Sequence, residues 1–121
     1  MNSKYIRGKI DSMAKTPGIE GCAVVEVSAG MVWHAAGPMV DLPRLAEAAS
    51  DYWRLYGRLK PNFEPLGEML CCVLIHATHR ITMVACGADM VILTVSQKTA
   101  TVDWPAWDVR VQQLEDLLLM E

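Results

Sequence analysis

The fold of this 121-residue chain is decided by residues 16–37, TPGIEGCAVVEVSAGMVWHAAG. Two runs in this stretch, residues 22–27 and 31–36, are rich in residues that favour strands, and Ser28-Ala29-Gly30 separates them. Two such runs joined by three residues that end in glycine are typical of an antiparallel hairpin. Gly37 and Pro38 follow, and both residue types interrupt regular structure. The stretch therefore predicts a two-stranded hairpin.

Three helices are predicted around this hairpin. Apolar residues recur at helical spacing over residues 4–15 and predict a first helix. Asp41 is a favourable N-cap for a second helix, which runs to about Leu59. Asp103 caps a third helix, whose apolar residues follow a 3-4-3-4 spacing from Trp104 onward.

Three further strands are expected at residues 68–76, 80–86 and 90–96, joined by short turns. The element order is then α-β-β-α-β-β-β-α. Because the connections between neighbouring strands are short, we expect an α+β fold with a five-stranded, mostly antiparallel sheet and helices on both faces. The length suits one domain over residues 1–121.

Composition excludes several classes of protein. The longest apolar run, residues 69–75, is far shorter than the ~20 residues of a membrane-spanning helix, so no membrane insertion is expected. The net charge of −3 disfavours binding to nucleic acid. The N-terminus lacks the apolar core of a signal peptide, which favours a cytoplasmic protein with reduced cysteines.

Charge is unevenly distributed along the chain. Residues 1–15 are basic and residues 103–121 are acidic, which favours two solvated faces over a dedicated basic docking patch.

The middle helix has an unusually wide apolar face. On a helical wheel its apolar residues cover about 180°, whereas a helix that packs on one sheet needs about 100°. The surplus part consists of Ala48, Tyr52, Leu55 and Leu59. The apolar run 69–75 gives the same indication, because a strand that is apolar at every position is expected to be buried on both faces. A symmetric dimer would cover both surfaces, and loops within a monomer are the alternative.

Motifs for catalysis or metal binding are weak. His76 and His79 form an HxxH pair across a predicted turn, but no pair of ligands has convincing zinc spacing, so we expect no metal and no cofactor. Cys86 is expected to be a packed cysteine rather than a nucleophile activated by a histidine. A thiol- or metal-dependent enzyme built on these three residues remains the least favoured of the alternatives.

The hairpin resembles the opening of the Roadblock family, which includes the dynein light-chain Roadblock proteins and late-endosomal adaptors. Pro17-Gly18-Ile19, Gly21, the strand 23–25 and Gly30 match the family pattern PGV-x-GAVVVD-x-DG. The middle helix and residues 66–96 resemble the later parts of the family domain, a profilin-like or longin-like architecture. Ala29 stands where the family usually has an acidic residue, and Trp33-His34 replaces smaller aliphatic residues.

The resemblance implies a non-enzymatic homodimer, or a heterodimer with a paralogue, that regulates or scaffolds a small Ras-like GTPase. Family members pair through the middle helix and the third strand, which are the two surfaces with surplus apolar residues. The predicted interface consists of Ala48, Tyr52, Leu55, Leu59, Leu70, Cys72 and Leu74. A second hypothesis is a small-ligand sensor of profilin-like or PAS-like architecture, which requires a sizeable apolar pocket between sheet and helices.

Overall fold

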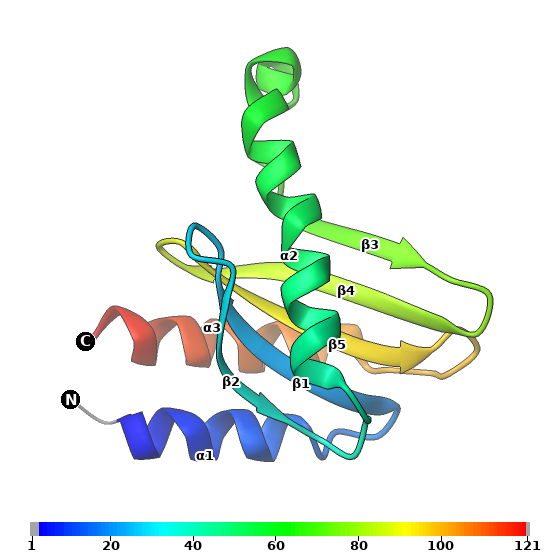
Figure 1. Cartoon of the computed structure of the whole chain (residues 1–121). Helices are drawn as coiled ribbons and strands as arrows, with labels where there is room; N and C mark the ends of the chain where they lie inside the picture. The colour runs from blue at the N-terminus through cyan, green and yellow to red at the C-terminus, as the bar shows by residue number, and fades with distance from the viewer. Residues whose placement is uncertain (1–2, 121) are drawn as a thin grey trace.

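The structure is a computed structural model that describes residues 3–120. Its elements follow the expected order (Figure 1). They are α1 (Ser3–Met13), β1 (Ile19–Glu26), β2 (Met31–Ala36), α2 (Leu42–Leu59), the 3₁₀ helix η1 (Lys60–Leu66), β3 (Cys71–Ile75), β4 (His79–Gly87), β5 (Met90–Gln97) and α3 (Trp104–Leu119). The α+β prediction is confirmed.

The five strands form one sheet in the order β2-β1-β5-β4-β3, and every neighbouring pair is antiparallel. Strands β2 and β3 therefore form its two edges. Strand β3 is shorter than predicted, because its pairing with β4 begins only where Cys71 lies opposite Val84. Residues 68–70 instead connect η1 to the strand.

Helices cover both faces of the sheet, and each face has its own core. Helices α1 and α3 lie side by side on one face, while α2 crosses the other (Figure 1). Successive residues of β1 point to opposite faces, so Cys22 and Val24 join the core under α1 and α3, and Ala23 and Val25 join the core under α2. Trp107 is the largest fully buried side chain of the first core.

Two glycines of the hairpin stretch have a clear structural role. Gly30 adopts a φ of 63° in the turn between β1 and β2, a conformation that glycine accepts more readily than other residues. A Cβ at Gly21 would lie 2.8 Å from a methyl carbon of Leu42, so this glycine lets the start of α2 pack closely on β1. The motif thus positions the middle helix as well as the hairpin.

The predicted helix caps have different outcomes. Asp103 accepts a hydrogen bond from the backbone N–H of Ala106, which confirms it as the N-cap of α3. Asp41 does occupy the N-cap position of α2, but its φ of 60° is left-handed and its side chain makes no capping hydrogen bond. An N-cap side chain reaches the first turn from extended backbone, which the tight turn into α2 does not provide here.

The basic and acidic ends of the chain lie beside each other in α1 and α3 (Figure 1). Lys9 Nζ donates to Gln113 Oε1 over 2.6 Å, and Arg110 donates to the hydroxyls of Ser12 and Thr16. Burial, followed by repulsion from Arg110, lowers the pKa of Lys9. Neutral acceptors therefore join the two helices at these positions. Glu121, which adds to the acidic end in the sequence, lies outside the described residues.

Candidate functional site

The outer side of α2 is an exposed apolar surface. Tyr52, Leu55 and Leu59 retain 42–55% of their accessible surface. Ala48, on the same side of α2, is also exposed. The inner side of the same helix buries Leu42, Ala46 and Ala49 against the sheet. The four positions that the helical wheel assigned to the surplus part of the apolar face are thus the ones that the fold leaves uncovered.

This surface continues past the end of the helix. The C-terminal half of α2 and η1 extend beyond the sheet (Figure 1). Phe63, Leu66 and Leu70 are exposed there, and the ring of Phe63 stacks on Tyr56 with 5.4 Å between ring centres. Sequence reasoning treated residues 60–66 as a linker and missed Phe63 and Leu66. Two apolar residues within a proline-containing linker were the available signal.

Strand β3 is an edge strand with two different faces. Cys72 and Leu74 are half-buried and pack against the core under α2. Val73 and Ile75 point to the other face, where 45% and 65% of their surface is exposed. A single chain therefore does not bury the strand on both faces as its apolar sequence predicted, because α3 packs beneath β4 and does not cover β3.

The predicted interface residues on this strand are consequently divided. Leu70 is exposed and precedes the strand, whereas Cys72 and Leu74 already contact the core of their own chain. The outer backbone edge of β3 pairs with no strand among residues 3–120. Unpaired edges of this kind are templates for strand addition.

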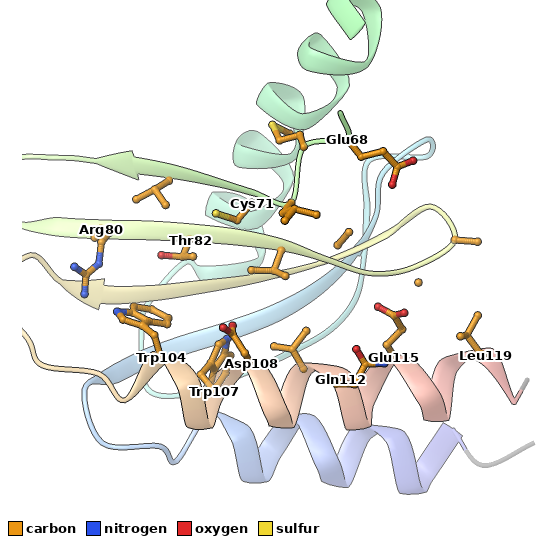
Figure 2. A pocket seen from close by; sticks show the side chains of 18 of the residues that line it. Glu68, Cys71, Arg80, Thr82, Trp104, Trp107, Asp108, Gln112, Glu115 and Leu119 are labelled. Atoms are coloured by element: carbon orange, nitrogen blue, oxygen red, sulfur yellow. The ribbon is translucent and has the colours of Figure 1, made fainter. Parts of the chain in front are cut away.

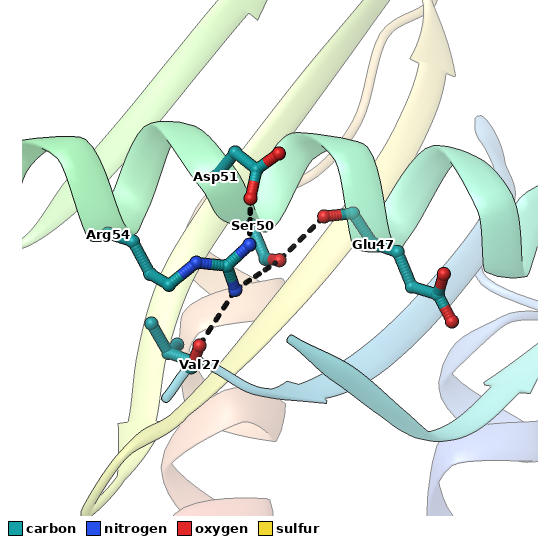
Figure 3. Close-up of polar contacts among 5 residues, drawn as sticks. All are labelled: Val27, Glu47, Ser50, Asp51 and Arg54. Atoms are coloured by element: carbon teal, nitrogen blue, oxygen red, sulfur yellow. Dashed lines mark hydrogen bonds and ion pairs between the residues drawn. The ribbon is translucent and has the colours of Figure 1, made fainter. Parts of the chain in front are cut away.

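A polar network fixes how α2 lies on the sheet (Figure 3). Arg54 Nη1 donates to the carbonyl of Val27 over 2.8 Å and to Ser50 Oγ over 3.1 Å, and its other nitrogen pairs with Asp51. Ser50 Oγ in turn donates to the carbonyl of Glu47. Because Arg54 joins α2 to the end of the first hairpin strand, the network orients the opposite side of the helix toward solvent.

A groove lies on the face of the sheet opposite α2, between β3, β4 and α3 (Figure 2). Its volume is about 990 Å³. Val73, Ile75 and Val84 line the sheet side, and Trp104 and Leu119 line the helix side. The sensor hypothesis required a sizeable apolar pocket between sheet and helices, and this groove has that position.

The residues of the proposed thiol chemistry do not come together. Cys86 is buried near the end of β4, whereas His79 begins the same strand. Seven residues separate them, or about 23 Å along a strand. Burial, with a further contribution from Glu115, raises the pKa of Cys86 to about 12, so the thiol is protonated near neutral pH. His79 Nε2–H instead donates to Glu20 Oε1 over 3.1 Å.

Other chemistry also lacks a site among the described residues. No cluster of three or more His, Cys, Asp or Glu side chains in residues 3–120 has the geometry to hold a metal ion. All four cysteines are free thiols. No helix within the same range is long and apolar enough to span a bilayer.

Comparison with solved structures identifies the architecture. A Roadblock/LC7 domain from Streptomyces avermitilis superposes with a TM-score of 0.74 at 14% identity, with 100% of both chains covered. The chain has the Roadblock/LC7 fold. MglB of Myxococcus xanthus has the same fold, with a TM-score of 0.73, 17% identity and coverage of 98% of this chain and 94% of MglB. An MglB with a tetrameric arrangement is similar at a TM-score of 0.71 and 14% identity, over 95% of this chain and 85% of that chain.

No protein-family model and no curated protein sequence matches the chain. The Roadblock/LC7 likeness therefore rests on the arrangement of helices and strands. The fold also accounts for two glycines in residues 16–37, since Gly21 packs closely against Leu42 and Gly30 adopts a positive φ in the hairpin turn.

Proposed function

We propose that this protein is a non-enzymatic, cytoplasmic Roadblock-like domain, spanning residues 1–121, that self-associates and regulates or scaffolds a small Ras-like GTPase. The observation that carries the proposal is the uncovered apolar surface of α2 next to an unpaired edge strand. The proposed interface consists of Ala48, Tyr52, Leu55, Leu59, Leu70, Cys72 and Leu74, to which Phe63 and Leu66 are added.

Self-association explains why these residues are apolar. Exposed side chains such as Leu55, Leu59 and Leu70 gain free energy when a second copy removes them from water. A two-fold axis beside β3 would pair the two edge strands and bring the two α2 helices together. The tetrameric arrangement of one MglB supports self-association of this fold.

The interface is tested by Leu55→Glu in the full chain. We expect the wild-type protein to be a dimer at micromolar concentration and the variant to be a monomer by light scattering. An unpaired carboxylate in the interface costs about 3–5 kcal/mol, which weakens the dimer at least about 100-fold. Val109→Glu is the matched control, because Val109 is an exposed apolar residue in the middle of α3 and lies outside the interface. Wild-type protein that is monomeric, or a Leu55→Glu protein that remains dimeric, would contradict the proposed surface.

The GTPase is tested separately. A Ras-like GTPase encoded near this protein is mixed with it in the GDP state and in the state with a GTP analogue, and complex formation is measured by size-exclusion chromatography. We expect a complex with one nucleotide state and a changed rate of GTP hydrolysis. No binding in either state would contradict the GTPase part of the proposal and leave the dimer unaffected.

A further inference from the structure

The groove between β3, β4 and α3 is long. The residues that line it on the helix run from Trp104 to Leu119, the full 16 residues of α3, which extend about 24 Å. Its volume of about 990 Å³ is at the upper limit of pockets for small molecules. A helix of about 16 residues has the same length as α3. The dimensions therefore favour a polypeptide helix over a small ligand.

Two buried donors beside this groove have no acceptor. Among residues 3–120, Arg80 Nε and Trp107 Nε1 are the buried side-chain nitrogens without a hydrogen-bond partner, and both residues line the groove. Trp107 is 99% buried, since only 1% of its surface is exposed. Leaving such donors unsatisfied costs about 1–3 kcal/mol each. An occupant that presents oxygen atoms at this end of the groove would relieve that cost.

The charges along the groove are also ordered. Arg80, with its guanidinium 5.2 Å from the ring centre of Trp104, lies at one end, whereas Glu115 and Leu119 lie toward the other (Figure 2). Asp108 lies between these ends, and Glu68 lines the opposite wall (Figure 2). A helix carries partial negative charge and unpaired carbonyls at its C-terminus, and partial positive charge at its N-terminus.

We propose that this groove binds an amphipathic helix of a partner protein. Its apolar side packs on Val73, Ile75 and Leu119, and basic residues on its flank face Asp108 and Glu115. Its C-terminal end lies at Arg80 and Trp107, where carbonyl or carboxylate oxygens accept from the two unpartnered donors. The site is on the opposite face of the sheet from α2 and adjoins the proposed interface at Leu70, which lines the groove.

The probe is a synthetic 16-residue helix with Leu at 3-4 spacing, Lys along one flank and Ala elsewhere, labelled for fluorescence anisotropy. We expect it to bind the full chain at least about tenfold more tightly than the same peptide with Glu in place of Lys, because Glu residues would face the acidic side chains of the groove. Equal binding of the two peptides, or no binding of either, would overturn the proposal.

Charge reversal locates the bound peptide. Glu115→Lys is expected to weaken binding of the Lys peptide about two- to fivefold, as for an exposed ion pair. Asp116→Lys is the matched control, since Asp116 is exposed on the same helix but does not line the groove. Equal effects of the two variants would place the peptide elsewhere.

Arg80→Gln tests the orientation of the bound helix. A Lys peptide that ends in a free carboxylate should lose more affinity toward this variant than one that ends in an amide. Trp107→Phe removes the unpartnered N–H and should weaken peptide binding. Because the smaller ring also leaves a cavity in the core, urea unfolding of the free variant is measured beside it, and peptide binding is compared under conditions where the variant is fully folded. If the two peptides respond equally to Arg80→Gln, the proposed orientation is wrong. Light scattering on the same samples measures whether the protein is still a dimer. A loss of peptide binding is thereby distinguished from a loss of the α2 dimer.

Discussion

The two edges of the sheet are built differently. Strand β2 is covered from both sides: Arg7 of α1 lies 5.4 Å from the ring centre of Trp33, Asp11 accepts from His34 over 2.8 Å, and the start of α2 contacts the strand. Its pairing with β1 also contains a bulge. Strand β3 pairs with β4 in unbroken register, carries no charged residue and has no helix over Val73 and Ile75.

This difference indicates which edge is available to another chain. Bulges, polar side chains and covering helices all discourage strand addition, and β2 has each of them. Strand β3 has none of these on its groove side. The two sheet edges are therefore unequal, and association with another chain is expected at β3 rather than at β2.

The largest expected contrast is in thiol reactivity between the exposed edge and the interior. Cys71 on β3 is exposed, whereas burial raises the pKa of Cys22 and of Cys86 from 9.0 to about 12. At pH 8 the buried thiols therefore contain about 1000-fold less thiolate than an ordinary cysteine. We expect Cys71 to react first with a thiol reagent, as followed by mass spectrometry, and the two buried cysteines to react last.

The Leu55→Glu variant is the background for this measurement, so that no dimer covers β3. All four cysteines should react quickly in denaturant. The raised pKa values also imply that stability depends on pH, because these two thiols ionise near pH 9 in the unfolded chain and near pH 12 in the folded one. The contribution of Cys22 and Cys86 to the free energy of unfolding is therefore complete below pH 9 and is lost between pH 9 and about 12. Native Cys86 that reacts as fast as Cys71 would show that the interior is open.

A smaller contrast is expected between the two faces of β3 itself. Leu74→Ala should lower the free energy of unfolding by about 2 kcal/mol, the low end for a buried leucine, because Leu74 is only half-buried against the core. Ile75→Ala should change it by less than about 0.5 kcal/mol, because Ile75 is mostly exposed. Urea unfolding of the monomeric background measures both. Equal losses would mean that the groove side of β3 is packed in solution.

The smallest expected effect concerns the cover of β2. Arg7→Ala removes the cation that lies over Trp33 and should reduce the free energy of unfolding by about 0.5–1 kcal/mol. Lys4→Ala is the control, because Lys4 is exposed on the same helix. Thermal or urea unfolding detects the difference. A loss no larger for Arg7→Ala than for Lys4→Ala would show that this contact does not hold α1 on the edge.

Much of the fold was predictable because its signals are local. The hairpin turn at Gly30, the bounds of α2 and the cap at Asp103 each depend on a few neighbouring residues. The position of the cap at Asp41 was also predictable, but the absence of a capping hydrogen bond was not. Its residue type favours a cap, but its left-handed backbone leaves the side chain without a capping hydrogen bond. Residue preference is a weak guide where tertiary contacts set φ and ψ.

The candidate sites divide in the same way. The sequence alone determined that α2 has a surplus of apolar residues, because helical periodicity places Ala48, Tyr52, Leu55 and Leu59 together. Only the tertiary structure decided that β3 is an edge strand, that Leu74 faces the core while Ile75 faces a groove, and that Arg80 and Trp107 lie beside that groove. Strand order and helix placement follow from contacts between residues far apart in the chain, which the periodicity of a single segment does not encode.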